Sequence, residues 1–377
     1  MAIISFTFDP AYIDKFISFG YQHYQGDKKW LPPLKKTIYN QFCSDYLFYN
    51  RKGNKHQHFL ATIGNKVVGR VSAFVNQDLN DENGFSVGNI GFYECVDDHN
   101  ISHDLLAAAT QWIIETQKIN CVWGPMNFDI WHGYRFKTRG FDQDIYVGEP
   151  YNKPYYEDQF LQFGFLPKRH WHSVELHGRS ALVQMIKPYR EFYYQLLERG
   201  YRFEFLNLKK FDSELHKLYS LLSQSFSGFL GYTQISFQQF KQIFTSYRFA
   251  FHPRLFTFVY DQSNILAGFA GAFLDIADSI RKMHGKSNLL AKTKFLLSRR
   301  CVDRIVFYIG GTTPREANKR SRLGKAGFYH LVNQIINEGF KKVIVALMAE
   351  TSRARGLLSG NENLSQRQYT LYEFTNT

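Results

Sequence analysis

A turn that combines glycines with basic side chains, at residues 319–327, has the composition of a phosphate-binding site. The first backbone N–H groups of a helix lack partners within the helix, and the peptide dipoles add partial positive charge there. Phosphate oxygens accept hydrogen bonds from these N–H groups, and their negative charge complements the dipole. Glycine lets the backbone approach the phosphate closely, and Lys or Arg adds charge-assisted hydrogen bonds. The sequence therefore predicts a pyrophosphate site made by Arg320, Ser321, Arg322, Leu323, Gly324, Lys325, Ala326 and Gly327.

Other phosphate loops have a different spacing. The turn contains no GxxxxGK[ST] pattern, and it lacks the three-glycine spacing of the dinucleotide fingerprint. An ordinary solvated basic turn remains the alternative interpretation. After the turn, apolar residues at helical spacing predict a helix that ends at Gly339. Its buried face is expected to hold Phe328, Leu331, Val332, Ile335 and Ile336.

The elements that must position this turn recur twice along the chain. Each copy reads as a helix, a hairpin, a strand, a turn, a helix and a strand. The segment 177–189 is the expected linker, which divides the chain into domains 1–189 and 190–377. In the first copy the second helix is expected over residues 102–117 with Ser102 as its N-cap. We expect an α/β fold with mixed sheets. The expected helices and strands lie at 10–24, 56–77, 86–96, 102–117 and 120–126, and then at 213–226, 254–276, 303–311, 324–338 and 341–348.

Composition sets broad limits on the class of protein. A length of 377 residues suits two domains, and 44% hydrophobic residues are ample for packed cores. No apolar run reaches about 18 residues, so no transmembrane helix is expected. The sequence begins without a basic signal-peptide region, and its four cysteines are scattered. Both features favour a reducing, cytoplasmic setting. A net charge of +13 favours phosphate-bearing partners, although it also fits a lysine-rich proteome.

The repeated order and the basic turn resemble the GNAT N-acyltransferase superfamily. The pyrophosphate loop of that superfamily has the pattern [QR]xxGx[GA], and this chain has SRLGKA at residues 321–326, with Ser321 in place of Arg or Gln. The resemblance is closer to bacterial tandem GNAT proteins of poorly defined function, and it covers nearly the whole chain. It rests on GDKKWLPPLKK, ATIGNKVVGRVSAFVN, GFYECVDD, WGPMNF, RGFD, PYNKPYYEDQFLQFGF and RQYTLYEF.

This resemblance implies two GNAT-like acyl-CoA N-acyltransferase domains in tandem. It also implies an acyl-CoA site between splayed fourth and fifth strands. The backbone of Tyr308, Ile309 and Gly310 would pair with the pantetheine arm of acetyl-CoA or of a longer acyl-CoA. At the corresponding turn of the first copy, Asp97 and Asp98 would repel a pyrophosphate. We therefore expect the first domain to be free of cofactor.

Acyl transfer to an amine requires a neutral amine, a polarised carbonyl and a proton for the leaving thiolate. Glu94 and Glu350 are the candidate bases and Tyr372 the candidate acid, although each also reads as a surface charge or a half-buried tyrosine. A segment dense in aromatic and polar residues, 123–136, could line a substrate pocket or form a packed aromatic corner. No metal site is expected. The candidate substrate-binding residues are Asn127, Trp131, His132, Tyr134 and Arg135.

Three functions follow from these features. The first is an N-acyltransferase that moves an acyl group from acyl-CoA to an amine of an unidentified acceptor. The second is a Fem-type transferase, which pairs two GNAT-like domains but takes an aminoacyl group from tRNA. The net charge favours it, and the cofactor-like turn weighs against it. The third is a non-catalytic, degenerate pair of domains that binds a ligand. The sequence leaves the acceptor, the acyl chain length and the oligomeric state open.

Overall fold

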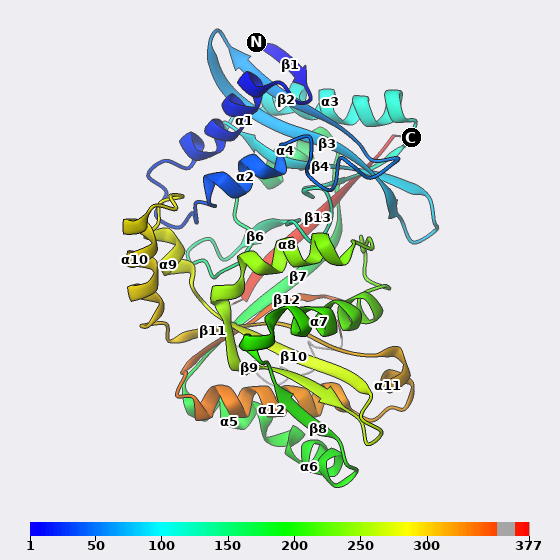
Figure 1. Cartoon of the computed structure of the whole chain (residues 1–377). Coiled ribbons are helices and arrows are strands. Elements are labelled where there is room, and N and C mark those ends of the chain that lie inside the picture. The colour runs from blue at the N-terminus through cyan, green and yellow to red at the C-terminus, as the bar shows by residue number, and fades with distance from the viewer. Residues whose placement is uncertain (353–365, 377) are drawn as a thin grey trace.

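A single mixed sheet runs through the whole molecule. The computed structural model describes residues 1–352 and 366–376. Over these residues the sheet has thirteen strands in the order β1-β2-β3-β4-β5-β13-β7-β12-β11-β10-β9-β8, with β6 paired to β13. In Figure 1 the first half of the chain lies at the top and the second half at the bottom, and β7, β12 and β13 lie between them.

The first half is an antiparallel sheet that turns parallel at β5. Helix α1 begins where the Asp9 carboxylate accepts hydrogen bonds from the backbone N–H groups of Ala11 and Tyr12, with Pro10 at the first helical position. Strands β2 and β3 form the predicted hairpin. The elements of this half are β1 (Ala2–Phe6), α1 (Pro10–His23), α2 (Lys35–Gln41), β2 (Lys55–Ile63), β3 (Lys66–Asn80), β4 (Ser86–Cys95), α3 (His99–Gln111), the π-helix η1 (Trp112–Thr116), β5 (Cys121–Gly124), β6 (Phe136–Arg139), α4 (Tyr156–Phe163) and β7 (Leu166–His177).

The start of α3 differs from the prediction. Ser102 is not the N-cap, because the helix begins three residues earlier, at His99. The Asp98 carboxylate accepts hydrogen bonds from the N–H groups of Asn100 and Ile101. A carboxylate at this position also interacts favourably with the helix dipole. The Ser102 hydroxyl lies inside the helix and donates to the His99 carbonyl oxygen.

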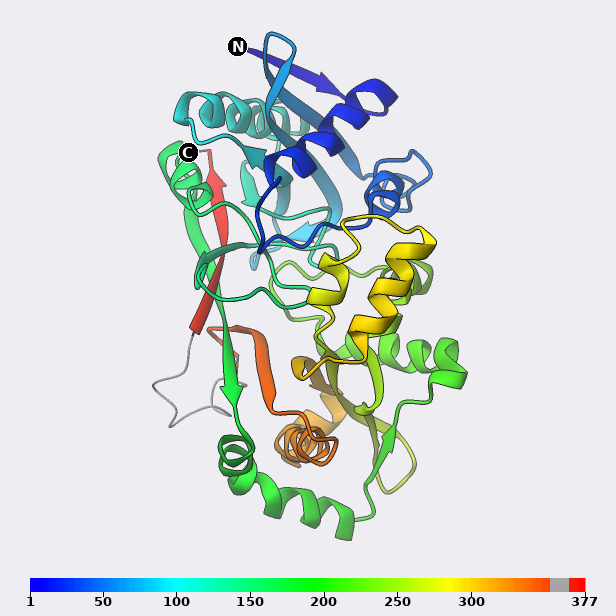
Figure 2. The ribbon, with the colours of Figure 1, turned by 90° about the vertical axis from the view of Figure 1, so that its left-hand side faces the viewer.

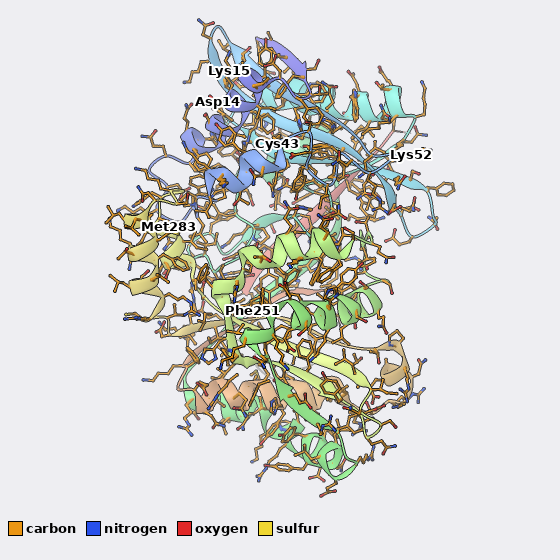
Figure 3. The ribbon with its side chains drawn as sticks, in the orientation of Figure 1. Asp14, Lys15, Cys43, Lys52, Phe251 and Met283 are labelled. Atoms are coloured by element: carbon orange, nitrogen blue, oxygen red, sulfur yellow. The ribbon has the colours of Figure 1, made fainter. Side chains whose placement is uncertain are left out.

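The second half repeats this arrangement around a larger core. Phe251, labelled in Figure 3, packs against the rings of Phe211, Phe256 and Phe273 in that core. The predicted buried face of α12 is confirmed, and Gly339 follows the helix with a φ of +85°. The elements are α5 (Arg179–Ile186), η2 (Lys187–Tyr189), α6 (Arg190–Glu198), β8 (Arg202–Phe205), η3 (Leu208–Lys210), α7 (Phe211–Ser225), α8 (Phe237–Ser246), η4 (Arg248–Ala250), β9 (Phe251–Tyr260), β10 (Leu266–Leu274), α9 (Ala277–Arg281), α10 (Leu289–Arg299), β11 (Arg304–Thr312), α11 (Pro314–Asn318), α12 (Leu323–Asn337), β12 (Lys342–Ala349) and β13 (Gln366–Thr375).

Two strands tie the halves together. Strand β7 of the first half pairs with β12 of the second, from His177 opposite Lys342 onward. Strand β13, at the end of the chain, returns to the first half and pairs with β5 and β7, as Figure 2 shows in red and green. The segment 177–189 includes α5, whose Leu182 is fully buried. The division into 1–189 and 190–377 stays a prediction.

No helix among the described residues is long and apolar enough to cross a lipid bilayer.

Candidate functional site

Strands β11 and β12 diverge halfway along their length. They pair in parallel from Arg304 opposite Lys342 to Phe307 opposite Val345. Beyond that point β11 stays paired with β10 as far as Thr312. Strand β12 instead stays with β7 and bulges near Leu347, whose φ is +51°. The edge of residues 308–310 that faces β12 therefore has no strand partner among the described residues, and the two strands form an open V.

The basic turn lies beyond the end of β11. The short helix α11 is inserted first, and α12 then begins at Leu323 with Arg322 as its N-cap, in the left-handed region. The Arg322 side chain forms no capping hydrogen bond, but the Ser321 hydroxyl accepts from the Leu323 N–H at 3.3 Å. A Cβ atom added to Gly324 would meet no atom within 4 Å, so the surface at this residue is uncovered. Gly327 faces the sheet instead, because its added Cβ would lie 3.7 Å from that of Ala270.

The cations of this turn differ in their partners. Lys319 is 3.0 Å from the Glu316 carboxylate and 3.5 Å from that of Asp261, so its charge is neutralised. Arg322 lies over the ring of Phe192, at 4.6 Å from the centroid. Arg320, Arg322 and Lys325 are exposed and form no ion pair with any described residue. Three positive charges therefore remain available for an anion beside the start of α12.

The equivalent V of the first half is filled. Strands β4 and β5 pair in parallel up to Asn89 opposite Trp123. The Met126 N–H then donates to the Ile90 carbonyl oxygen at 2.7 Å, and the Phe92 N–H donates to the Asn127 Oδ1 at 2.7 Å. A Cβ atom on Gly91 would lie 2.4 Å from the Met126 carbonyl oxygen. The chain itself thus occupies the space beside β4, and Asp98 caps the helix that follows.

The three candidate catalytic residues lie in different surroundings. Glu94 lies in the first half with 15% of its side chain exposed; the Tyr156 hydroxyl donates to it at 2.6 Å and Arg70 lies 3.6 Å away. Burial raises the pKa of Glu94, and the Arg70 charge opposes that shift. Tyr372 is also in the first half, on β13, where its hydroxyl donates to Glu157 at 2.6 Å. Burial raises the pKa of Tyr372.

Glu350 lies apart from both, in an exposed turn just after β12. Its backbone N–H donates to the His170 carbonyl oxygen at 3.0 Å, and its carboxylate is 3.8 Å from Arg169. The structure thus gives Glu94, Tyr372 and Glu350 separate partners and does not gather them around the open V. Their catalytic roles stay predictions.

Two of the candidate substrate-binding residues make contacts between segments. The Trp131 indole N–H donates to the Thr233 carbonyl oxygen at 3.0 Å, and its ring packs against Tyr232 and Phe240 of the second half. The spacing of Trp131 in the sequence gave no sign of this contact. Asn127, as described above, fills the V of the first half.

His132 belongs to a buried chain of hydrogen bonds. Its Nδ1 lies 2.7 Å from the Asp129 carboxylate, and its Nε2 lies 2.5 Å from the Tyr46 hydroxyl. A ring that donates from Nδ1 to Asp129 accepts at Nε2 from the Tyr46 hydroxyl. Sequence reasoning missed both partners. The Asp-x-x-His spacing of Asp129 and His132 was a usable signal, whereas nothing local marks Tyr46.

Arg135 and Tyr134 lie beside the open V of the second half. The guanidinium of Arg135 is 3.8 Å from the ring centroid of Tyr134 and 4.3 Å from that of Trp171. Trp171 on β7 stands opposite Ala349, at the end of β12 that diverges from β11. On the β11 side, the Tyr308 hydroxyl donates to the Gly148 carbonyl oxygen at 2.8 Å. Burial raises the pKa of Tyr308, and the Arg135 charge opposes that shift.

A buried ionic network, which the sequence did not reveal, lies at the junction of the two halves. The Lys137 ammonium is 2.8 Å from the Glu149 carboxylate, and both side chains are fully buried. The Tyr369 hydroxyl donates to Glu149 at 2.6 Å. Arg367, on β13, lies 3.0 Å from Glu175 on β7. This network fixes the 140–150 segment, which contacts Tyr308, against strands from both ends of the chain.

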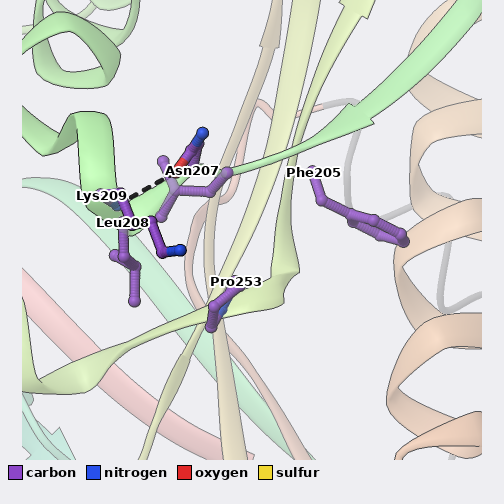
Figure 4. A pocket seen from close by; sticks show the side chains of 6 residues that line it. Phe205, Asn207, Leu208, Lys209 and Pro253 are labelled. Atoms are coloured by element: carbon purple, nitrogen blue, oxygen red, sulfur yellow. Dashed lines mark hydrogen bonds between the residues drawn. The ribbon is translucent and has the colours of Figure 1, made fainter.

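Two surface hollows lie elsewhere. The larger, of about 480 Å³, is lined by residues 205–209 and Pro253, and within it the Lys209 N–H donates to Asn207 at 3.0 Å (Figure 4). It adjoins β8, at the far edge of the sheet from the first half. The smaller, of about 220 Å³, is lined by Tyr46 and its neighbours and by Gln242 of α8. Among the described residues, no group of three or more His, Cys, Asp and Glu is placed to hold a metal ion.

Comparison with known sequences finds relatives that match part of the chain. No known family profile matches the sequence. The chain is 26% identical over 153 residues to Protein YghO of Escherichia coli (strain K12), which is 40% of this chain and 38% of that protein. It is 23% identical over 252 residues to the bacterial ceramide synthase of Caulobacter vibrioides (strain NA1000 / CB15N), which is 66% of this chain and 64% of that protein. The chain thus spans less than two thirds of the length of either relative.

Solved structures show the fold directly. A tandem GNAT protein from the clavulanic acid biosynthesis pathway aligns over 99% of this chain and 98% of that one, with a TM-score of 0.55 and 9% identity. The fold is therefore that of the tandem GNAT proteins. The resemblance seen in the sequence and the expected mixed α/β class are both confirmed.

Proposed function

We propose that this protein is an N-acyltransferase that takes an acyl group from acetyl-CoA or a longer acyl-CoA and transfers it to an amine. The supporting observation is the contrast between the two V-shaped splays. Among the described residues no strand pairs with the edge of residues 308–310 in the second half, whereas in the first half Asn127 already holds the corresponding amide of Phe92. Unpaired backbone groups on an inner strand are suited to the amides of a pantetheine arm.

The pyrophosphate of the same cofactor would lie at the start of α12. The surface at Gly324 is uncovered, and Arg320, Arg322 and Lys325 supply charge. The N–H groups on either side of Gly324 already have acceptors, since Leu323 donates to the Ser321 hydroxyl at 3.3 Å and Lys325 to the Arg322 carbonyl oxygen at 2.9 Å. In the first half, Asp98 already accepts from the corresponding N–H groups of α3. We therefore propose one acyl-CoA per chain, in the second half, with the first half shaping the acceptor side of the cleft.

The chemistry that this arrangement supports is direct transfer. The amine nitrogen attacks the thioester carbon, the C–N bond forms, the C–S bond breaks, and the proton lost by the amine ends on the thiolate of CoA. Holding the amine and the thioester together supplies much of the acceleration in such reactions. A ceramide is the N-acyl amide of a long-chain amino alcohol, so the relative named ceramide synthase supports an amine acceptor and a long acyl chain.

Thermal unfolding with acyl-CoA tests this proposal. A ligand at a hundredfold excess over its dissociation constant stabilises a fold by about 2.7 kcal/mol, which is visible as a rise in melting temperature. We expect a rise with acetyl-CoA or octanoyl-CoA that is lost in the double variant Arg320→Ala, Arg322→Ala. The control removes two positive charges from the first half, at Lys15 and Lys52 (Figure 3), and should keep the rise. No rise with any acyl-CoA would refute the proposal.

A further inference from the structure

Arg135 carries a buried charge without a counter-charge. It is one of three buried arginines among the described residues, with 8% of its surface exposed. The other two have carboxylate partners: Arg70 lies 3.6 Å from Glu94, and Arg367 lies 3.0 Å from Glu175. Within the described part of the chain Arg135 forms no ion pair, and its Nε and Nη1 have no hydrogen-bond partner there. Burial of an unpaired charge is strongly unfavourable.

The aromatic neighbours of Arg135 compensate for only part of this. The rings of Tyr134 and Trp171, at 3.8 Å and 4.3 Å, attract the positive charge through their π faces. The two rings do not accept hydrogen bonds from the N–H groups of Arg135, because those groups lie in the plane of the guanidinium and point away from its faces. Among the described residues, the N–H groups of Nε and Nη1, which point to different sides of the guanidinium, therefore remain free for the oxygen atoms of an anion such as a carboxylate or a phosphate.

The backbone of Arg135 is also held in an unusual conformation. Its φ is +73°, a left-handed value that is unfavourable for a residue with a Cβ. Its N–H donates to the Pro125 carbonyl oxygen at 2.8 Å, and the neighbouring Tyr134 forms a β-bridge with Met126. Strain and an unpaired charge coincide at this one residue. Such residues are concentrated at binding and catalytic sites.

The position of Arg135 links it to the open V. Its partner Trp171 stands opposite Ala349, two residues beyond the bulge at Leu347 where β12 leaves β11. This end of β12 lies on the side of the V toward the first half, and β11 with residues 308–310 lies on the other. A group bound to Arg135 would therefore lie on the acceptor side of a thioester held along β11.

We infer that Arg135 binds an acidic group, a carboxylate or a phosphate, on the acceptor substrate. The acceptor is then an amine with an acidic group close by, such as an amino acid or a phosphorylated amino alcohol, rather than a neutral amine. This inference rests on the proposed function for the amine. The anion site itself rests only on the geometry around Arg135.

The test measures binding of three small amines to the full chain by saturation-transfer NMR. L-Serine carries a carboxylate, O-phosphoethanolamine a phosphate, and ethanolamine neither. We expect one acidic probe to bind more tightly than ethanolamine, and its affinity to fall at least about tenfold in Arg135→Gln and less in Arg135→Lys. The matched control Arg139→Gln changes an exposed arginine four residues on and should bind as wild type. The better acidic probe identifies the acidic group.

A second measurement leaves Arg135 unaltered, so its result does not depend on whether the Arg135 variants fold. The chain has 5 tryptophans, so 5-fluorotryptophan labelling gives few signals, and Trp171→Phe assigns the one in contact with Arg135. The acidic probe should shift that signal, and ethanolamine should not. The inference is overturned if ethanolamine binds as well as both acidic probes, if neither acidic probe binds, or if Arg135→Gln binds like wild type.

The two proposals fail separately. Acyl-CoA stabilisation without binding of an acidic probe would leave the proposed function intact and remove the anion site. Binding of an acidic probe at Arg135 without acyl-CoA stabilisation would leave the anion site intact and remove the proposed function.

Discussion

The backbone N–H of Phe92 donates a hydrogen bond of 2.7 Å to the side-chain oxygen of Asn127, across the V where β4 leaves β5. In the second half no described strand pairs with the corresponding edge of β11 beyond Phe307, because β12 stays with β7. Over the described residues the chain therefore contains two versions of the same splay, one closed by its own side chain and one open. This difference underlies the assignment of the cofactor to the second half.

Asn127 should matter for stability and not for cofactor binding. Asn127→Ala removes the acceptor of the partly buried Phe92 N–H, and the loss of such a hydrogen bond costs about 1 kcal/mol. We expect the free energy of unfolding, measured by chemical denaturation, to fall by that amount while acyl-CoA affinity stays unchanged. The control Asn120→Ala alters an exposed asparagine and should have little effect. A loss of acyl-CoA affinity in Asn127→Ala would instead place the cofactor in the first half.

The buried pair of Lys137 and Glu149 should be essential for folding. Lys137→Met leaves the Glu149 carboxylate buried without its nearest cation, 2.8 Å away. Removal of one partner of such a pair typically costs about 3–5 kcal/mol. The control Lys168→Met breaks ion pairs of a more exposed lysine and should cost less than about 1 kcal/mol. Equal losses from the two variants in urea denaturation would contradict a special role for the buried pair.

Stability should fall in mild acid because several histidines are buried in the neutral form. Burial lowers the pKa of His330 from 6.5 to about 4. The folded state thus binds the proton less readily than the unfolded state, and the stability from this group is complete above pH 6.5 and lost as pH falls toward 4. One such histidine accounts for a loss of about 3 kcal/mol.

The matched test of this pH effect replaces His330 with Phe, which keeps an aromatic ring against Tyr193 and Phe203. Unfolding free energies measured at several pH values should decline less steeply toward pH 4 in this variant. His103→Phe, which changes an exposed histidine, should leave the slope unaltered. A slope in His330→Phe equal to that of wild type would show that His330 does not take part.

Local patterns in the sequence were sufficient for the repeated elements. The apolar spacing that begins at Phe328 predicted α12 and its buried face, and the polar turn at 65–66 predicted the hairpin of β2 and β3. The helix start at Ser102 was predicted wrongly, because Asp98 is the better cap and the side chain of Ser102 turns to the His99 carbonyl. N-cap propensity alone did not decide between Asp98 and Ser102 as the residue that caps the helix.

Contacts between distant segments were not predictable in this way. The pairing of β13 with β5 and β7 depends on which edge is free after the rest of the sheet has formed, and no local pattern encodes that choice. The sequence did single out Arg135. Its defining property, a buried charge without a carboxylate, depends on the absence of a partner in space, which one sequence does not reveal.

Calorimetric titration of the full chain with acyl-CoA, using matched changes at the two helix starts, tests the central claim most directly. Gly324→Glu and Asn100→Glu each place a carboxylate at the second residue of α12 and α3, where an acidic side chain suits the helix dipole. We predict one acyl-CoA per chain, an affinity at least about tenfold weaker in Gly324→Glu, and no change in Asn100→Glu. No binding to wild type, two cofactors per chain, or a loss confined to Asn100→Glu would contradict the account.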